Sequence, residues 1–169
     1  MFKSLNLVNW RGVAALLFTS ASLATMSTAA LADINTSVHL NFRGDARAAL
    51  TFYQSVFGGD EMVITYKDAH ADKNPAEADQ VIWGQVVAKN GFHVMAFDVP
   101  SGVDWNQGVI PVFVSIRGDN PEEITGHWKK LSAGSTVVKP LGPSGFSPLY
   151  GMVKDRFGVT WVRDVQKAP

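Results

Sequence analysis

The chain has 169 residues, with 15 Lys and Arg against 15 Asp and Glu, no Cys, and 46% hydrophobic residues. This length predicts one globular domain, or one domain with an appendage. A net charge of zero excludes an electrostatic basis for nucleic-acid binding, which needs a basic excess to displace counterions. The absence of cysteine excludes disulfides, thiolate nucleophiles and zinc–thiolate sites.

The first 32 residues are typical of a secretory signal peptide. Lys3 and Arg11 form a basic start, an apolar stretch begins at Val13, and small residues lead to Ala32. We predict cleavage after Ala32, which places the remaining domain, residues 33–169, in the periplasm or outside the cell. A membrane anchor is the alternative, because residues 13–32 are about long enough to span a bilayer.

Six Ser or Thr residues interrupt that stretch and weaken it as a permanent span. We therefore expect no stable membrane insertion after cleavage. Removing residues 1–32 takes away two basic residues and no acid, so the rest has 13 basic and 15 acidic residues and a net charge of −2. A domain of this size buries roughly two-thirds of its unfolded surface, which is enough for one core.

The first half of the domain predicts the element order β-α-β-β-β. Apolar and polar residues alternate over 37–42, which indicates a half-buried strand. Asp45 stands where a helix N-cap is expected, apolar residues follow at helical spacing, and Gly58-Gly59 ends the helix. Strands are predicted at 61–66, 81–88 and 92–98, with a polar loop at 67–80 and a hairpin turn at Asn90-Gly91.

The second half repeats this order. A strand is predicted at 109–117, and Asn120-Pro121 followed by two acids opens a helix that ends at Gly134. Three strands at 135–139, 150–154 and 159–165 follow, with a Gly/Pro loop at 141–148. The tetrapeptide at 42–45, Phe-Arg-Gly-Asp, recurs 74 positions later as Ile-Arg-Gly-Asp, which supports duplication.

The predicted fold is therefore α+β, with two tandem βαβββ modules that form a curved mixed sheet around a cleft. Alternation assigns the first-strand residues of each module to two faces. The residues expected to face the helices are Val38, Leu40, Phe42, Val112, Val114 and Ile116. The residues expected to face the cleft are His39, Asn41, Phe113 and Ser115.

Two segments carry a resemblance to a known superfamily. Residues 41–59, NFRGDARAALTFYQSVFGG, resemble the opening strand and helix of the vicinal-oxygen-chelate superfamily, which contains glyoxalase I, bleomycin-resistance proteins and extradiol dioxygenases. Residues 150–161, YGMVKDRFGVTW, resemble the closing hairpin of its PhnB-like subgroup. The resemblance implies the glyoxalase/bleomycin-resistance fold, often a homodimer and, in the enzymes, a divalent metal held by His, Glu or Gln. Some PhnB-like members are labelled demethylubiquinone methyltransferase-like, but we find no methyl-donor motif in this chain.

The implied metal ligands are incomplete in this sequence. His39 and Gln85 lie near two of the positions that the resemblance implies. The matching first-strand position of the second module holds Phe113 beside Val112, and residues 160–162, where metal enzymes place Glu, are Thr-Trp-Val. Because a divalent ion needs three or four N or O ligands held together, we expect no cofactor and no complete metal site. A bound divalent metal is the alternative.

The predicted site is instead a cleft for a small organic ligand, with no catalytic residue assigned. Aromatic walls with a few polar groups are the usual way of holding small planar molecules. The alternative role for His39 is a hydrogen bond to a neighbouring carbonyl. The alternative for most of the aromatic residues is packing in the hydrophobic core. Trp105 is the exception, because it lies in a predicted Gly-bounded loop. The predicted ligand-binding residues are His39, Asn41, Trp83, Gln85, Trp105, Tyr150 and Trp161.

These observations favour an exported protein that binds a small molecule between its modules and forms a homodimer. A second hypothesis is a metal-dependent lyase or isomerase of the glyoxalase type that uses His39 and Gln85. A third is sequestration of a toxic drug at a dimer interface, as the bleomycin-resistance relatives do.

Overall fold

The computed structural model describes residues 36–109 and 112–166. Residues Asn35–Pro169 form one compact unit, and everything described below belongs to it. The predicted signal peptide lies outside the described residues. Among the helices of the described ranges, none is long and apolar enough to cross a membrane.

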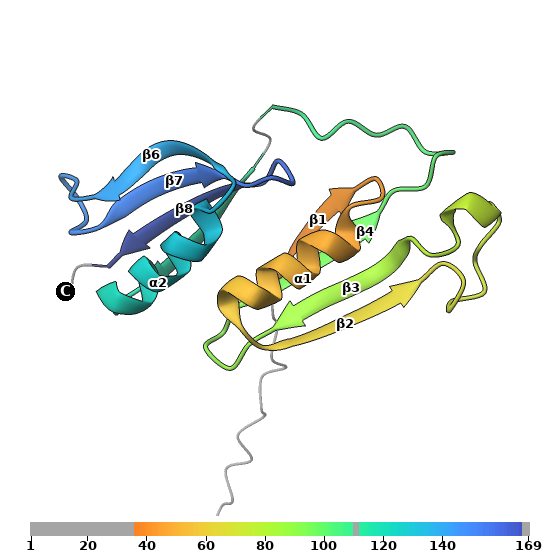
Figure 1. Cartoon of the computed structure of the whole chain (residues 1–169), viewed down its shortest axis with the longest axis horizontal. Coiled ribbons are helices and arrows are strands. Elements are labelled where there is room, and N and C mark those ends of the chain that lie inside the picture. The colour runs from red at the N-terminus through yellow and green to blue at the C-terminus, as the bar shows by residue number, and fades with distance from the viewer. Residues whose placement is uncertain (1–35, 110–111, 167–169) are drawn as a thin grey trace, which may run out of the picture. The chain divides into compact units, whose positions relative to one another are not determined.

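The described part of the chain contains two βαβββ modules, in the order predicted from the sequence (Figure 1). Module 1 consists of β1 (Val38–Phe42), α1 (Ala46–Phe57), β2 (Asp60–Thr65), the short 3-10 helix η1 (Pro75–Glu77), β3 (Val81–Val87) and β4 (His93–Asp98). Module 2 consists of β5 (Phe113–Gly118), α2 (Pro121–Ser132), β6 (Thr136–Gly142), β7 (Tyr150–Lys154) and β8 (Thr160–Val165).

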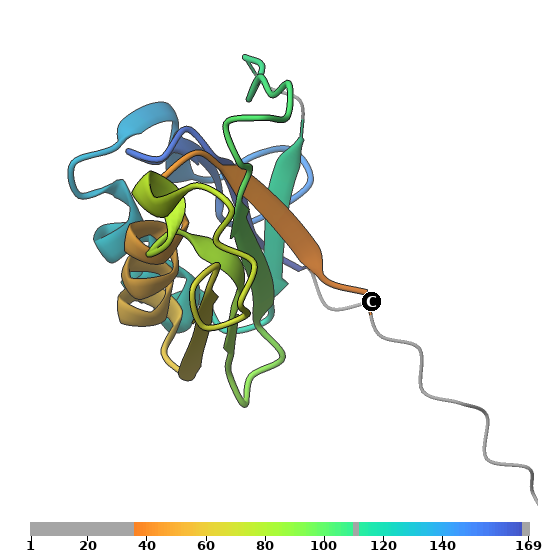
Figure 2. The same cartoon turned by 90° about the vertical axis from the view of Figure 1, so that its right-hand side faces the viewer.

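Each module has its own four-stranded mixed sheet. The strand orders are β1-β4-β3-β2 and β5-β8-β7-β6, and the first strand of each module pairs in parallel with its last. The other neighbours are antiparallel. Each helix covers one face of its own sheet and leaves the opposite face, here called the open face, without a helix (Figure 1, Figure 2). This arrangement confirms the predicted fold.

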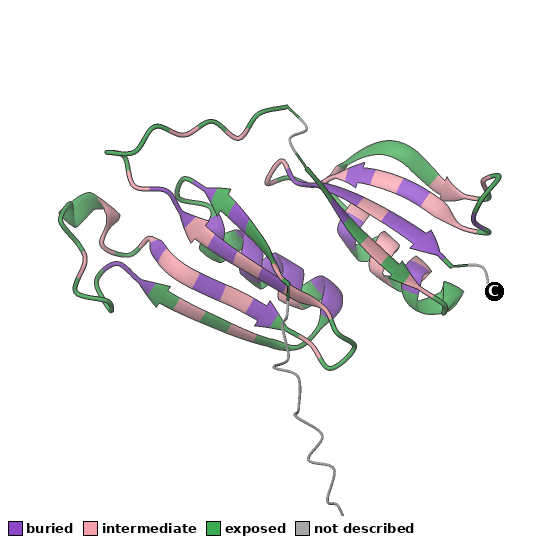
Figure 3. Ribbon diagram, turned by 180° about the vertical axis from the view of Figure 1, so that it is seen from behind, coloured by how far each residue is buried: buried purple, intermediate pink, exposed green. Residues whose placement is uncertain are grey.

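Burial alternates along the strands as the sequence predicts (Figure 3). Leu40, Phe42 and Val114 are buried beneath the helices, whereas the residues expected on the open faces are exposed. Val38 and Val112, which we expected to face the helices, are 39% and 56% exposed, because they lie at the beginning of β1 and just before β5. The exposed open-face residues of the two first strands are His39, Asn41, Phe113 and Ser115.

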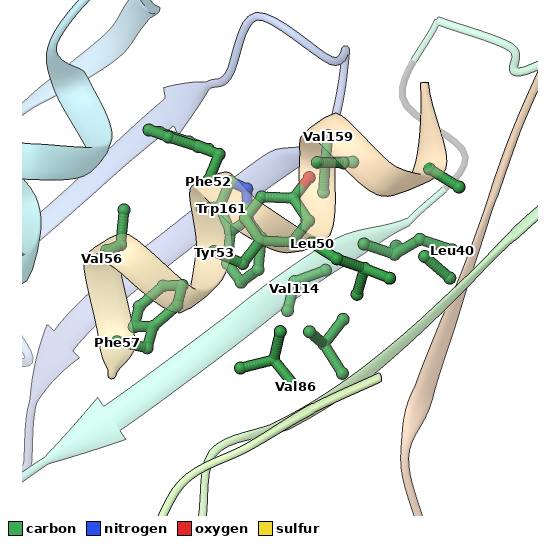
Figure 4. Close-up of a cluster of buried hydrophobic side chains, with 14 of the residues drawn as sticks. Leu40, Leu50, Phe52, Tyr53, Val56, Phe57, Val86, Val114, Val159 and Trp161 are labelled. Carbon is green, nitrogen blue, oxygen red and sulfur yellow. The ribbon is translucent and has the colours of Figure 1, made fainter. Parts of the chain in front are cut away.

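A single hydrophobic core joins the two modules (Figure 4). Tyr53 of α1 packs edge-on against Trp161 of β8, with 5.0 Å between the ring centroids. Asp155, in the β7–β8 turn, is buried and accepts hydrogen bonds from the Tyr53 hydroxyl (2.9 Å) and the Trp161 indole nitrogen (2.8 Å). Burial and the Asp155 carboxylate both raise the pKa of Tyr53, so its hydroxyl keeps its proton and remains a donor to this bridge.

The beginning of α1 differs from the prediction. Asp45 precedes the helix but makes no side-chain capping bond, and Asp98 at the end of β4 accepts from the Gly44 and Ala46 N–H groups at 2.7 and 3.1 Å. Asn120 does cap α2 as predicted, accepting from the Glu122 and Glu123 N–H groups. β6 also runs into the predicted Gly/Pro loop, because it continues pairing with β7 as far as Gly142.

Candidate functional site

The segment between β4 and β5, described at 99–109 and at 112, is here called the linker. A pocket of about 300 Å³ lies where β1, the linker and the β7–β8 turn come together. From β1 it is lined by His39 and Asn41 on the open face, and from the linker by Trp105 and its neighbours. Residues Gly158–Thr160 form the remaining wall. Three of the seven predicted ligand-binding residues, His39, Asn41 and Trp105, therefore line one cavity although two segments far apart in the sequence supply them.

The linker is held in place by specific contacts. Arg43 donates from Nη2 to the Val103 carbonyl at 2.6 Å, and its guanidinium lies 5.5 Å from the centroid of the Trp105 ring. Gln107 donates from Nε2 to the Phe157 carbonyl at 2.7 Å, which fastens the linker to the β7–β8 turn. A half-buried Trp105 is thus fixed beside the pocket.

His39 supplies the titratable group of the pocket. Burial lowers the pKa of His39 below its ordinary value of 6.5, so the ring is neutral at neutral pH. It packs edge-to-face against Phe97 of β4, with 6.2 Å between the centroids. A neutral imidazole has one N–H donor and one lone pair, so His39 can donate to or accept from a bound polar group. The side-chain amide of Asn41 can likewise donate and accept hydrogen bonds.

Gln85 and Trp83 lie on the open face of module 1 but outside this pocket. Met95 of β4 stands between His39 and Gln85, since Met95 pairs with both. The Gln85 Oε1 atom instead lies 3.1 Å from Nε2 of His93. The structure therefore does not bring His39 and Gln85 together as a pair of ligands.

The two predicted residues of module 2 occupy different surroundings. Tyr150 lies half-buried on the open face, with the Lys139 ammonium 4.8 Å from its ring centroid. Trp161 pairs with Val114, whose side chain faces the helix, and is fully buried in the core. The register of β8 therefore makes Trp161 a packing residue at the module junction, where we expected a wall of the cleft.

The residues of the open faces do not fit a metal site of the type that the resemblance implies. In the described ranges, no three His, Asp or Glu side chains are grouped closely enough to share an ion. On the open face of module 2, Phe113, Thr160 and Val162 offer no imidazole or carboxylate, and the carboxylate of Asp164 is already paired with Arg117 at 3.2 Å. The donors of module 1 are thus not completed by donors from module 2.

Sequence reasoning missed the residues that position the linker. Arg43 appeared only as part of the repeated tetrapeptide, and Gln107 was not singled out in the Gly-bounded loop that contains Trp105. Their partners lie 60 and 50 residues away along the chain, so no local pattern could reveal the contacts. The Arg43–Trp105 pair is consistent with the expectation that a tryptophan in this loop is not explained by core packing.

Comparison with known proteins identifies a family. Residues 34–162 match the family model described as 3-demethylubiquinone-9 3-methyltransferase. A search of the curated proteins found no match.

Several solved structures resemble the chain. Protein PA1353 from Pseudomonas aeruginosa is 26% identical with a TM-score of 0.70, over 80% of this chain and 100% of that one. A putative 3-demethylubiquinone-9 3-methyltransferase, PhnB protein, from Bacillus cereus is 24% identical with a TM-score of 0.62, over 78% and 99%. A glyoxylase/bleomycin resistance protein/dioxygenase domain from Frankia sp. EAN1pec is 15% identical with a TM-score of 0.58, over 82% and 100%. The last two similarities concern the fold.

Proposed function

The chain belongs to the 3-demethylubiquinone-9 3-methyltransferase family, a PhnB-like group of vicinal-oxygen-chelate proteins, and from that premise we propose that it binds a small organic molecule in the His39–Trp105 pocket. The observation that carries this proposal is the convergence of His39, Asn41 and Trp105 on one cavity of about 300 Å³. The proposal includes export through the predicted signal peptide and the lack of a complete metal site.

The pocket favours a flat, uncharged ligand with one or two polar groups. Trp105 offers an aromatic surface, while His39 and Asn41 offer both donors and acceptors at its side. Because the histidine is neutral, the pocket has no strong charge with which to select an ion. Its volume is at the small end of the range for ligand sites, which suits a molecule of one or two rings.

Native mass spectrometry of the purified protein tests this function. We expect a small molecule to co-purify with the wild type, and Trp105→Ala or His39→Ala to weaken its binding about tenfold or more. Trp83→Phe is the matched control, because Trp83 lies on the same open face but outside the pocket. Equal ligand occupancy in all four proteins would contradict the proposed site.

The metal-dependent lyase is the competing hypothesis, and elemental analysis of the same preparations separates it from simple binding. We expect no stoichiometric divalent metal. A metal bound one-to-one to the wild type and lost in His39→Ala would overturn the metal-free proposal. For drug sequestration, the corresponding test is the sensitivity of a deletion strain to glycopeptide drugs such as bleomycin.

Export and dimerisation have direct tests of their own. The proposal predicts that the protein recovered from the periplasm or the medium begins at Asp33. It also predicts a homodimer by light scattering. Recovery of the intact chain in the membrane fraction would favour the anchor over the cleaved signal peptide.

A further inference from the structure

Arg163 of β8 is a buried arginine that forms no ion pair with any described residue. Its side chain is fully buried on the helix face of the module 2 sheet. Within the described ranges its Nε and Nη1 atoms have no hydrogen-bond partner. Only Nη2 is engaged, at 2.8 Å from Nδ1 of His127 on α2. Three N–H bonds of a charged group are therefore buried and unused, an arrangement that destabilises the protein unless an acceptor is bound.

The contact with His127 fixes the state of that histidine. Arginine has no lone pair to offer, so Nδ1 of His127 must be the acceptor and the ring proton must lie on Nε2. Nε2 in turn faces Glu123 Oε1 at 3.9 Å, and Asn90 donates to the same oxygen at 3.0 Å. Burial, and then the charge of Arg163, lower the pKa of His127, which agrees with a neutral ring. His127 therefore brings no negative charge to Arg163, and the carboxylates of Glu123 and Asp164 act on it without forming an ion pair within 4.0 Å.

Arg163 lines a second cavity of about 440 Å³ between the modules. This cavity shares no lining residue with the His39–Trp105 pocket. Phe57 at the end of α1 and Phe92 after the β3–β4 turn form an apolar wall, stacked on each other with 4.1 Å between centroids. Ile124 of α2 adds aliphatic surface. The cavity thus combines a buried cation with apolar surface large enough for a ring.

The charges around this cavity favour a single negative charge on the ligand. Glu123 and Asp119 lie at its border, and Arg117, also at the border, is paired with Asp164 at 3.2 Å. No ion pair of the described residues joins Arg163 to a carboxylate within 4.0 Å. Glu123 is about half exposed, so solvent screens it more than it screens Arg163. Glu123 and Asp119 repel a dianion such as phosphate more strongly than a monoanion, so the single positive charge of Arg163 favours a ligand with one negative charge.

We infer that the Arg163 cavity is a binding site for a small organic carboxylate with an apolar body. The carboxylate accepts from Nε or from Nη1 of Arg163, whose N–H bonds point to different sides of the guanidinium, and the apolar body contacts Phe57, Phe92 and Ile124. His127 is a positioning residue that holds the guanidinium through Nη2. This site goes beyond the proposed function and does not depend on it.

Nuclear magnetic resonance of the arginine Nε–H groups tests the inference on the purified wild-type protein. Benzoate is the probe, and benzamide is the neutral probe of the same shape. We expect benzoate, but not benzamide, to shift the Arg163 Nε–H resonance. Arg163→Met should weaken benzoate binding about tenfold to a hundredfold, as expected for the loss of a charge-assisted hydrogen bond.

Arg156→Met is the matched control, because Arg156 is exposed, stacks on Phe52 at 4.2 Å and lies outside the cavity. This variant should bind benzoate like the wild type. An Arg163 resonance that benzoate does not move, an equal response to benzamide, or unchanged binding in Arg163→Met would each overturn the inference. Because the resonance is read on the wild type, the test stands even if a variant folds poorly.

Discussion

Asp98 and Arg163 occupy matching positions in the two modules, yet they carry opposite charges. Phe42 pairs with Asp98 along β1 and β4, and Ile116, its counterpart in the repeated tetrapeptide, pairs with Arg163 along β5 and β8. Both charged side chains are buried beneath the helix of their module. The two modules thus place a buried charge at the same position opposite the first strand, with opposite signs.

The two charges differ in how fully the protein uses them. Asp98 accepts from the Gly44 and Ala46 N–H groups through Oδ1, and from the Val81 N–H at 2.9 Å through Oδ2. It therefore replaces the missing side-chain cap of α1 and fastens the beginning of β3. In module 2, the side chain of Asn120 caps α2, so Arg163 at the matching position is not needed to cap the helix. Both carboxylate oxygens of Asp98 therefore accept hydrogen bonds from the protein, whereas Nε and Nη1 of Arg163 remain available to a ligand.

The largest expected effect is the loss of Asp98. Asp98→Ala removes the acceptor of three backbone N–H groups in a buried place, so we expect the free energy of unfolding to fall by about 3–5 kcal/mol. Chemical denaturation monitored by circular dichroism measures this loss of unfolding free energy. Asp45→Ala is the control, because Asp45 is exposed and makes no capping bond, and it should cost less than about 0.5 kcal/mol. Equal losses in the two variants would show that Asp45 caps α1 after all.

A smaller effect is expected from the titration of His127. Burial first and Arg163 second lower its pKa in the folded protein, so the unfolded chain binds the proton more readily below the ordinary value of 6.5. The contribution of His127 to stability is therefore complete above pH 6.5 and is lost as the pH falls from there toward the folded-state pKa.

His127→Gln tests this dependence, because a glutamine oxygen can still accept from Arg163 without titrating. Urea midpoints measured above and below pH 6.5 should differ less in His127→Gln than in the wild type. The pKa of His39 is also lowered, so a remainder of the pH dependence should persist in both proteins. An unchanged pH dependence in the variant would show that His127 does not contribute.

The smallest expected effect on stability belongs to Arg163. Replacing a buried, poorly paired charge by an apolar side chain of similar size is often neutral or stabilising. Arg163→Met without ligand should therefore unfold within about 1 kcal/mol of the wild type, in contrast to Asp98→Ala. A loss of several kcal/mol in Arg163→Met would show that Arg163, like Asp98, is required by the fold.

The sequence predicts the fold well because burial repeats at regular intervals. The alternation in 38–42 and the helical spacing from Ala46 to Phe57 correspond directly to β1 and α1. His39 and Asn41 followed from the same alternation, and Trp105 from its place in a Gly-bounded loop. These predictions need only local patterns and the order of the elements.

Contacts between distant segments could not be predicted in this way. The capping of α1 by Asp98 joins residues more than fifty positions apart, and a local cap by Asp45 was the natural expectation. The placement of Trp161 depends on the register of β8 against β5, which one strand alone does not reveal. The role of His127 could not be predicted either, because its partner Arg163 is 36 positions away and comes from another element.

A crystal structure of the protein grown with benzoate would test most directly whether Arg163 is free for a ligand while Asp98 is not. We expect the benzoate carboxylate within hydrogen-bond distance of Nε or Nη1 of Arg163 and its ring against Phe57 and Phe92. We expect Asp98 to remain bonded to Gly44, Ala46 and Val81. An Arg163 whose Nε and Nη1 are both satisfied by groups of the protein itself, with benzoate bound elsewhere or not at all, would contradict it.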